Sequence, residues 1–207
     1  MTCTDTITLE VDDLAAAERF YTAFGLGALV GLRAAREPTS GFRGFALSLL
    51  VSQPADVDAL VDAALGAGAT ALKPAAKSLW GYGGTVQAPD GTIWTVATSA
   101  KKDTGPATGR IDGVVLLLGG ADVAASKRFY LGRGLTAAKS FGRMYVEFAA
   151  GRGPVKPALY RRRALAKNVG VAPEGTGSHR IAIGGATEPF TDPDGFAWEP
   201  APVAARP

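Results

Sequence analysis

The sequence reads Asp13-Leu14-Ala15-Ala16-Ala17-Glu18-Arg19-Phe20-Tyr21 near its beginning and Asp122-Val123-Ala124-Ala125-Ser126-Lys127-Arg128-Phe129-Tyr130 beyond its middle. Both stretches begin with Asp, continue through small residues and end in Arg-Phe-Tyr. Each is followed at the same distance by Gly-Leu, at residues 25–26 and 134–135. Self-similarity of this kind indicates an internal duplication.

A second pair of motifs recurs in the same order. Pro89-Asp90-Gly91 is followed by Trp94, and Pro193-Asp194-Gly195 is followed by Trp198. Proline early in a turn and glycine later in it favour a tight turn, and the alternating apolar residues that follow predict a strand. We therefore interpret the chain as two copies of one unit, each closing with a hairpin.

Each copy also begins in the same way. Residues 7–11 and 114–118 are apolar and predict strands, and Asp13 and Asp122 can cap the free N–H groups of the helices that follow. The apolar positions of the first helix recur at helical spacing: Leu14, Ala17, Tyr21 and Phe24. Strands and helices together predict an α+β class.

Composition limits the class of protein. A chain of 207 residues with 47% hydrophobic content can bury a core and is too apolar for disorder. The polar residues 101–109 predict a linker between domains at 1–100 and 110–207. No apolar run approaches the roughly 18–20 residues of a membrane span, and the lone Cys3 excludes an internal disulfide. We expect a cytoplasmic protein with no membrane partner.

The chain carries a formal net charge of +3, and its densest basic patch is Arg161-Arg162-Arg163, with Lys156 and Lys167 nearby. Such a patch can bind phosphates or another anionic ligand, or it can be a solvated strand end. We favour the second interpretation, because no nucleic-acid motif or aromatic platform accompanies the patch. We therefore expect no nucleic-acid partner.

Taken together, these motifs resemble the vicinal-oxygen-chelate superfamily, which includes glyoxalase I, extradiol dioxygenases and bleomycin-resistance proteins. The matching features are Val11-Asp12-Asp13-Leu14, the Arg19-Phe20-Tyr21 helix, Gly66-Ala67-Gly68-Ala69, Lys73-Pro74, Trp80-Gly81-Tyr82-Gly83-Gly84 and the two hairpins that end in Trp. The resemblance covers nearly the whole chain. It implies tandem βαβββ modules that form two glyoxalase-like domains, with curled mixed sheets around a ligand cleft.

The two domains depart from that pattern in complementary ways. In domain 1–100, residues 32–45 are too few for the usual third and fourth strands, whereas the second helix is clear. In domain 110–207, strands are expected around residues 143–149 and 157–162, but the segment between Ile183 and Asp192 has no room for a second helix. We expect one coupled body that is a monomer or a weak homodimer.

The resemblance also implies metal-ligand positions, and most of them carry no ligand here. The two first-strand His positions are Thr6 and Val115, the closing Glu positions are Thr95 and Glu199, and the inner-strand His positions are Arg43 and His179. Only His179 and Glu199 are donors, which would make a weak site. We expect no metal and no other cofactor, and true glyoxalase I activity would lack its electrophile. A divalent metal at His179 and Glu199, an acid–base role and a structural histidine remain the alternatives.

Aromatic residues are the other candidates for a ligand site, because they stack on planar or apolar molecules. The residues proposed as ligand-binding are Trp80, Tyr82, Trp94, Tyr145 and Trp198. Core packing is the alternative for each of them. Trp80 and Tyr82 are the best candidates, since the glycines around them indicate a loop.

We therefore favour a metal-independent small-molecule binding protein of the glyoxalase and bleomycin-resistance type, which sequesters a planar or amphipathic metabolite or antibiotic. The alternative is a lyase or isomerase of the same superfamily that acts on a small oxygenated substrate, with His179 and Glu199 as catalytic residues. An interaction module that uses the fold as a scaffold is a third class. No phosphate-binding loop or dinucleotide fingerprint occurs, which argues against NAD, FAD and ATP.

Overall fold

The computed structural model describes residues 4–151 and 153–200, so Cys3 lies outside the described residues. Its elements in chain order are β1 (Thr6–Val11), α1 (Leu14–Ala23), β2 (Gly31–Ala34), β3 (Thr39–Gly41), β4 (Phe45–Leu50), α2 (Pro54–Gly66), β5 (Thr70–Ser78), β6 (Gly81–Gln87), β7 (Ile93–Thr98), β8 (Gly113–Gly120), α3 (Val123–Gly132), β9 (Ala137–Phe141), β10 (Tyr145–Phe148), β11 (Val155–Arg161), α4 (Arg162–Val169), β12 (Gly175–Gly177), β13 (Ile181–Ala186), β14 (Phe190–Thr191) and β15 (Ala197–Pro200). The α+β class is confirmed.

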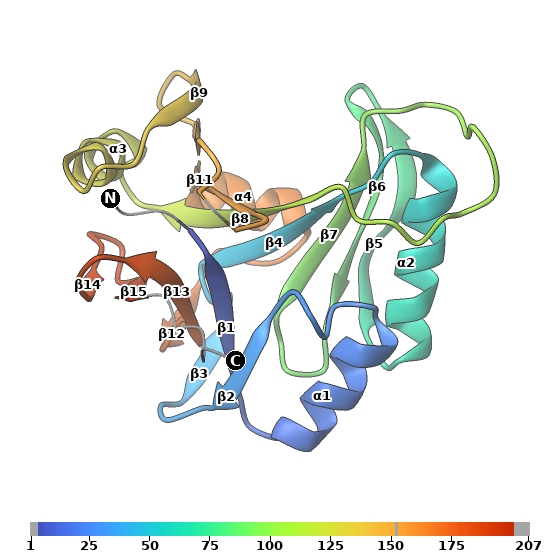
Figure 1. Cartoon of the computed structure of the whole chain (residues 1–207), viewed down its shortest axis with the longest axis horizontal. Coiled ribbons are helices and arrows are strands. Elements are labelled where there is room, and N and C mark those ends of the chain that lie inside the picture. Colours follow the sequence, from blue (N-terminus) through green and yellow to red (C-terminus); the bar gives the residue numbers. More distant parts are fainter. Residues whose placement is uncertain (1–3, 152, 201–207) are drawn as a thin grey trace, which may run out of the picture.

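Two complete βαβββ modules form the larger sheet (Figure 1). One module runs from β4 through α2 to β7, and the other from β8 through α3 to β11. The strand order is β5-β6-β7-β4-β8-β11-β10-β9, and in each module the first strand lies parallel to the last. The modules meet where β4 and β8 pair in antiparallel fashion, from Phe45 opposite Leu118 to Leu50 opposite Gly113.

Two shorter modules form the smaller sheet, in the order β14-β15-β13-β1-β2. The first module keeps its helix, α1, but adds only β2 beside β1. The last module has β13, β14 and β15, with no helix between them in this described stretch. Strands β3 and β12 pair separately as a two-stranded ribbon.

The sheets do not follow the two halves of the sequence. Each sheet contains strands from both sides of residues 101–109, because β4 pairs with β8 and β1 pairs with β13. Both sheets are mixed, as expected, but they are open rather than curled around a cleft. The halves of the sequence therefore share both sheets.

The helix starts and hairpin turns follow the sequence signals. The Asp13 carboxylate accepts from the Ala16 N–H at 2.9 Å, and Asp122 caps α3 in the same way. Gly91 and Gly195 have φ values of +89° and +93°, which suit glycine in a tight turn. These local predictions are confirmed.

Helices α1 and α3 each contact a Pro-Asp-Gly hairpin through one tyrosine–tryptophan pair. Tyr21 of α1 lies 5.9 Å from Trp94, ring centre to ring centre, and its hydroxyl donates to Asp90 at 2.9 Å. Tyr130 of α3 lies 5.5 Å from Trp198, whose indole N–H donates to the Tyr130 hydroxyl at 3.1 Å. Helices α1–α3 and the smaller sheet share one apolar core with one face of the larger sheet.

The opposite face of the larger sheet is covered in part by α4, a helix that the sequence reading did not predict. Leu165, Ala166 and Val169 of α4 are fully buried and share a second core with Val115 and Leu117 of β8. The basic stretch that we interpreted as a solvated strand end is therefore the end of β11 and the first turn of α4. Its arginines are half-buried or exposed, while the next residues pack inward.

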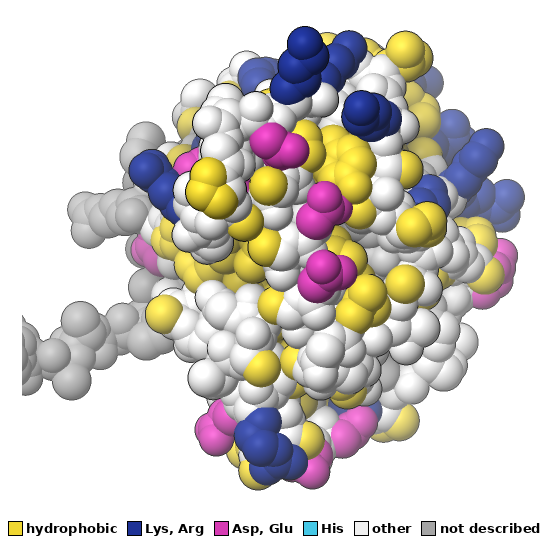
Figure 2. All heavy atoms as spheres, turned by 90° about the vertical axis from the view of Figure 1, so that its right-hand side faces the viewer, with side chains coloured by type: hydrophobic (Ala, Val, Ile, Leu, Met, Phe, Trp, Pro, Cys, Tyr) yellow, Lys and Arg dark blue, Asp and Glu magenta, His cyan; other side chains and the backbone are white. Residues whose placement is uncertain are grey.

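Residues 104–109 form hydrogen bonds with side chains at the start of α2. The buried Asp56 accepts hydrogen bonds from the Thr108 hydroxyl at 3.0 Å and from the Gly109 N–H at 3.1 Å. The side-chain oxygen of Gln53 accepts from the Thr104 N–H at 2.8 Å. Figure 2 shows the face that α2 and this segment cover, with acidic side chains near its centre and basic ones toward its edges. The segment predicted as a linker is thus held by side chains of the first half.

No helix in the described part of the chain is long and apolar enough to cross a membrane.

The shared sheets predict that neither half folds alone. Residues 1–100 would lack one of the two neighbours of β1 and one of the two neighbours of β4, and residues 110–207 would lack one neighbour of β13 and one of β8. We expect each fragment to show no cooperative thermal transition by circular dichroism, and an equimolar mixture to regain one. Two independent cooperative transitions would contradict the shared-sheet arrangement.

A pH-dependent contribution to stability is expected from Asp56. Burial alone would raise the pKa of its carboxyl group, but the hydrogen bonds from Thr108, Gly109 and Ser52 outweigh burial and hold the pKa below its ordinary value. A lowered pKa contributes stability above the unfolded-state value, and this contribution is lost as the pH falls through the folded-state value. Asp56→Asn should therefore cost about 1–3 kcal/mol at pH 7.

Urea titrations of the unchanged protein and of Asp56→Asn between pH 7 and pH 3 would measure the difference in their unfolding free energies. We expect the gap in unfolding free energy to narrow as the pH falls below about 4. Asp62→Asn is the matched control, because Asp62 lies exposed on the same helix. A gap that does not change with pH would argue against the carboxylate as its source.

Candidate functional site

His179 is held by the backbone on both sides. Its Nδ1 lies 2.5 Å from the Arg43 carbonyl oxygen, and its Nε2 lies 3.0 Å from the Asp194 carbonyl oxygen. The ring stacks on Phe196, with centroids 4.1 Å apart. A metal ion or a substrate would have to displace a carbonyl before it reached either nitrogen.

Glu199 belongs to a different cluster. Arg33 donates to both of its carboxylate oxygens at 2.9 Å and also pairs with Glu10 at 2.6 Å. His179 and Glu199 therefore have separate sets of partners. Within residues 4–151 and 153–200, no group of three or more His, Cys, Asp or Glu residues could hold a metal ion. Any catalytic role for the two residues remains a hypothesis.

Two of the five aromatic candidates lie in the core. Trp94 and Trp198 are 0% and 1% exposed, respectively, and they make the contacts with Tyr21 and Tyr130 described above. Trp198 also stacks on Phe190 with centroids 5.4 Å apart. These tryptophans join helices to hairpins and do not line an open surface, which favours the core-packing alternative, and their role in ligand binding stays a prediction.

Tyr82 and Tyr145 are partly buried and each bonds a carboxylate. The Tyr82 hydroxyl donates to Asp58 of α2 at 2.8 Å, and the Tyr145 hydroxyl donates to Glu147 at 3.0 Å. Burial, and then the negative charge of Glu147, raise the pKa of the Tyr145 hydroxyl above its ordinary value. Tyr145 lies on β10 and packs against the second core, which contains the buried residues of α4. In the larger sheet β10 is far from the β5–β6 hairpin.

Trp80 is the aromatic candidate that lies in the open. It sits at the turn between β5 and β6 and is 88% exposed, beside Leu79 at 89%. A Cβ at Gly81 would overlap the Thr98 carbonyl, and Gly81 has φ +136°, so the turn requires glycine there. The hairpin therefore presents two large apolar side chains to solvent.

Trp80 borders a groove of about 390 Å³ on the α4 face of the larger sheet. We call it the hydroxyl groove, because Ser48, Thr85, Thr95 and Thr98 line it. Lys73 and Lys77 also line it, and Asn168 closes it at the end of α4. Lys73 Nζ donates to the carbonyls of Lys167 and Asn168 at 3.1 and 2.5 Å, so it pins the helix end to β5.

The lining of the hydroxyl groove indicates its chemistry. Its hydroxyl groups can donate or accept hydrogen bonds, and in the described part of the chain the only ionised side chains that line it are lysines. Thr95 occupies the position where the resemblance implies a metal-binding glutamate. The groove thus suits an uncharged or acidic organic molecule. Sequence reasoning missed Ser48, Thr85 and Thr98 as lining residues, although Thr85 and Thr95 stand out as polar residues that alternate with buried apolar ones.

Comparisons with solved structures agree with this architecture. The chain is similar to glyoxalase I from Zea mays, with a TM-score of 0.62 and 17% sequence identity over 96% of this chain and 91% of that chain. It is also similar to a putative dioxygenase from Bacillus subtilis subsp. subtilis str. 168, with a TM-score of 0.54 and 12% identity over 88% of this chain and 70% of that chain. The chain therefore has the fold of the vicinal-oxygen-chelate superfamily, as the resemblance implied.

Sequence comparison adds nothing to this likeness, because no family model and no curated protein matches the chain. At these identities, the similarity concerns the fold alone.

The engaged donors lead us to expect no tightly bound divalent metal. Both His179 nitrogens face carbonyl oxygens, and Arg33 neutralises Glu199. Elemental analysis after dialysis should find zinc, nickel, iron and manganese well below one equivalent. One equivalent of any of them, lost in both His179→Gln and Glu199→Gln, would restore the metal-site hypothesis.

Proposed function

We propose that the chain is a metal-independent binder of a small planar or amphipathic molecule, which it holds in the hydroxyl groove. The supporting observation is that Trp80, 88% exposed, borders this groove of about 390 Å³. A tryptophan left in solvent forgoes the stabilisation of burial, and a planar ligand stacked on it would recover part of that stabilisation. We further propose that the protein works in the cytoplasm as a monomer or a weak homodimer.

The expected affinity follows from the number of contacts. A stacking contact contributes about 0.5–1.5 kcal/mol beyond burial. Burial of one face of a planar ligand and hydrogen bonds to the groove hydroxyls add to this stacking contribution. Together these contributions are compatible with a micromolar dissociation constant, which corresponds to a binding free energy of about −8 kcal/mol. Lys77 at the groove would favour a ligand with an acidic group.

The lyase or isomerase alternative has less support. It needs a base or a metal ligand, and His179 has a carbonyl oxygen within 3.0 Å of each ring nitrogen. Of residues 4–151 and 153–200, no histidine, aspartate or glutamate lines the hydroxyl groove. An interaction module would instead use the exposed Leu79 and Trp80 pair, a smaller surface than stable interfaces bury.

Replacing Trp80 tests the proposal. We expect Trp80→Ala to weaken binding of the anionic dye 8-anilinonaphthalene-1-sulfonate, whose naphthalene ring is flat, about tenfold in a fluorescence titration, or about 1.4 kcal/mol. The unfolding free energy should change by less than about 0.5 kcal/mol, because the side chain is exposed. Trp94→Ala, in the core, should instead cost about 3–5 kcal/mol.

Leu79→Ala is the matched control, since Leu79 is equally exposed at the same turn. We expect it to change the dye affinity less than twofold. Equal losses in the two variants would point to a general apolar patch, and no loss in Trp80→Ala would remove the groove proposal.

A further inference from the structure

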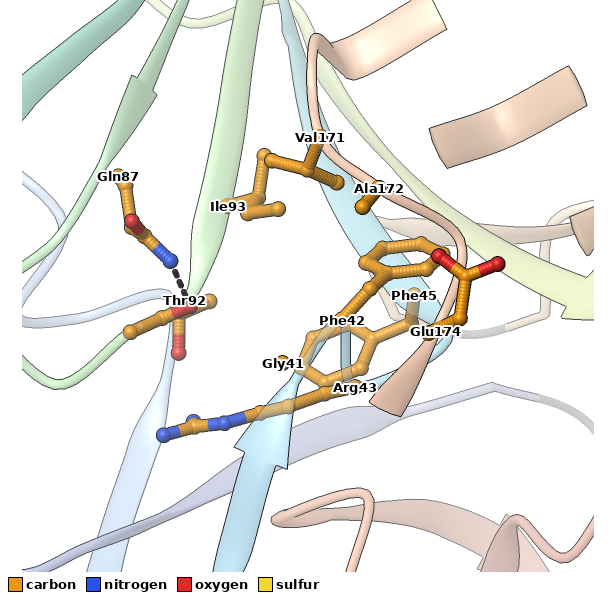
Figure 3. A pocket seen from close by; sticks show the side chains of 11 residues that line it. Gly41, Phe42, Arg43, Phe45, Gln87, Thr92, Ile93, Val171, Ala172 and Glu174 are labelled. Atoms are coloured by element: carbon orange, nitrogen blue, oxygen red, sulfur yellow. Dashed lines mark hydrogen bonds between the residues drawn. The ribbon is translucent and has the colours of Figure 1, made fainter. Parts of the chain in front are cut away.

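Two adjoining hollows border the first turn of α4 and the segment that follows the helix, and Trp80 lines neither of them. The first, the apolar hollow, has about 260 Å³ and lies among Phe42, Phe45, Ile93, Val171 and Ala172 (Figure 3). The second, the cationic hollow, has about 600 Å³ and extends toward the β3–β12 ribbon. Phe42, Arg43 and Glu174 line both, so the hollows meet at these three residues.

The cationic hollow carries an excess of positive charge. Arg43, Arg162 and Arg163 line it, and Glu174 is the only acidic side chain that lines it among the described residues. Within residues 4–151 and 153–200, none of these arginines forms an ion pair. Their charges are therefore available to an anion from solution.

Neutral partners fix Arg162 in place. Its Nη2 donates to the Phe42 carbonyl at 2.8 Å and its Nε to the Pro173 carbonyl at 3.2 Å. The guanidinium also lies 5.2 Å from the centre of the Phe42 ring. A Cβ at Gly44 would overlap Nη1 of this group, so glycine makes the room for it. A guanidinium held in this way binds an anion with little further loss of side-chain entropy.

Arg43 extends along the apolar hollow below Thr92 (Figure 3). Its Nη2 donates to the Asp90 carbonyl, and its Nη1 is buried without a hydrogen-bond partner. Burial lowers the pKa of the Arg43 guanidinium from its ordinary value. An unpartnered buried donor is costly, so the remaining interaction that Arg43 offers at the hollow is its positive charge.

We propose that the two hollows form one site for a small organic phosphate, with the phosphate in the cationic hollow and an apolar group in the apolar hollow. Guanidinium groups match phosphate oxygens in geometry as well as charge. Thr39, Thr176 and Ser178 add hydroxyls along the ribbon side of the same hollow. A volume of about 260 Å³ admits one ring or a short acyl chain, which selects a small molecule over a macromolecule.

Calorimetric titration with phenyl phosphate, inorganic phosphate and phenol tests the site. We expect phenyl phosphate to bind at least about tenfold more tightly than either fragment, because it alone fills both hollows. Arg163→Gln should weaken phenyl phosphate binding about tenfold. Arg161→Gln is the matched control, because Arg161 is exposed two residues away and does not line the hollow.

Two further variants separate the parts of the proposal. Ala172→Met should fill the apolar hollow, abolish the advantage of phenyl phosphate and leave inorganic phosphate binding unchanged, and Ala172 is exposed enough to accept the change. Trp80→Ala should leave phenyl phosphate binding intact, which separates this site from the hydroxyl groove. Undetectable phenyl phosphate binding, equal affinity for inorganic phosphate, or equal losses in Arg161→Gln and Arg163→Gln would each overturn the proposal.

Discussion

The antiparallel pairing of β4 with β8 is the constraint on which the rest of the structure depends. It joins two βαβββ modules into a single eight-stranded sheet, from Phe45 opposite Leu118 to Leu50 opposite Gly113. Alternation along these strands then assigns Leu47 and Leu116 to the main core, and Val115 and Leu117 to the opposite face. Since a slip of one residue would exchange the two faces, this register determines where every candidate site lies.

Helix α4 divides the second face. Its apolar residues cover the middle of the sheet, and Lys73 fastens its last turn to β5. The hydroxyl groove remains open near that end, and the two hollows border the first turn and the segment that follows the helix. One sheet face thus presents two surfaces of different chemistry, one rich in hydroxyl groups and one rich in guanidinium groups.

The sequence predicted the features that short-range signals specify. Asp13 and Asp122 cap helices, and the Pro-Asp-Gly turns form where the motifs stand, because each depends on a few neighbouring residues. For Trp94 and Trp198 the sequence left core packing and ligand binding both open, since the helices that bury them lie far away in the sequence. Of the two proposed sites, the sequence indicated the exposure of Trp80, from the glycines around it, and offered the basic patch at residues 161–163 as one candidate for an anion site, although we favoured a solvated strand end. That Arg43 and Arg162 line one hollow depends on α4 and the β3–β12 ribbon, which no local pattern indicated.

The pairing of β1 with β13 also bears on how the chain matures. Thr6 lies opposite Gly184 and Leu9 opposite Ile181, so the first strand emerges from the ribosome long before its antiparallel neighbour is synthesised. Through that interval Ile7 and Leu9 must remain unpaired on that edge or be shielded by another protein, because apolar strand edges promote aggregation. The smaller sheet is therefore the last part of the fold that can close, and the yield of native protein in a cell should depend on chaperones that bind nascent chains.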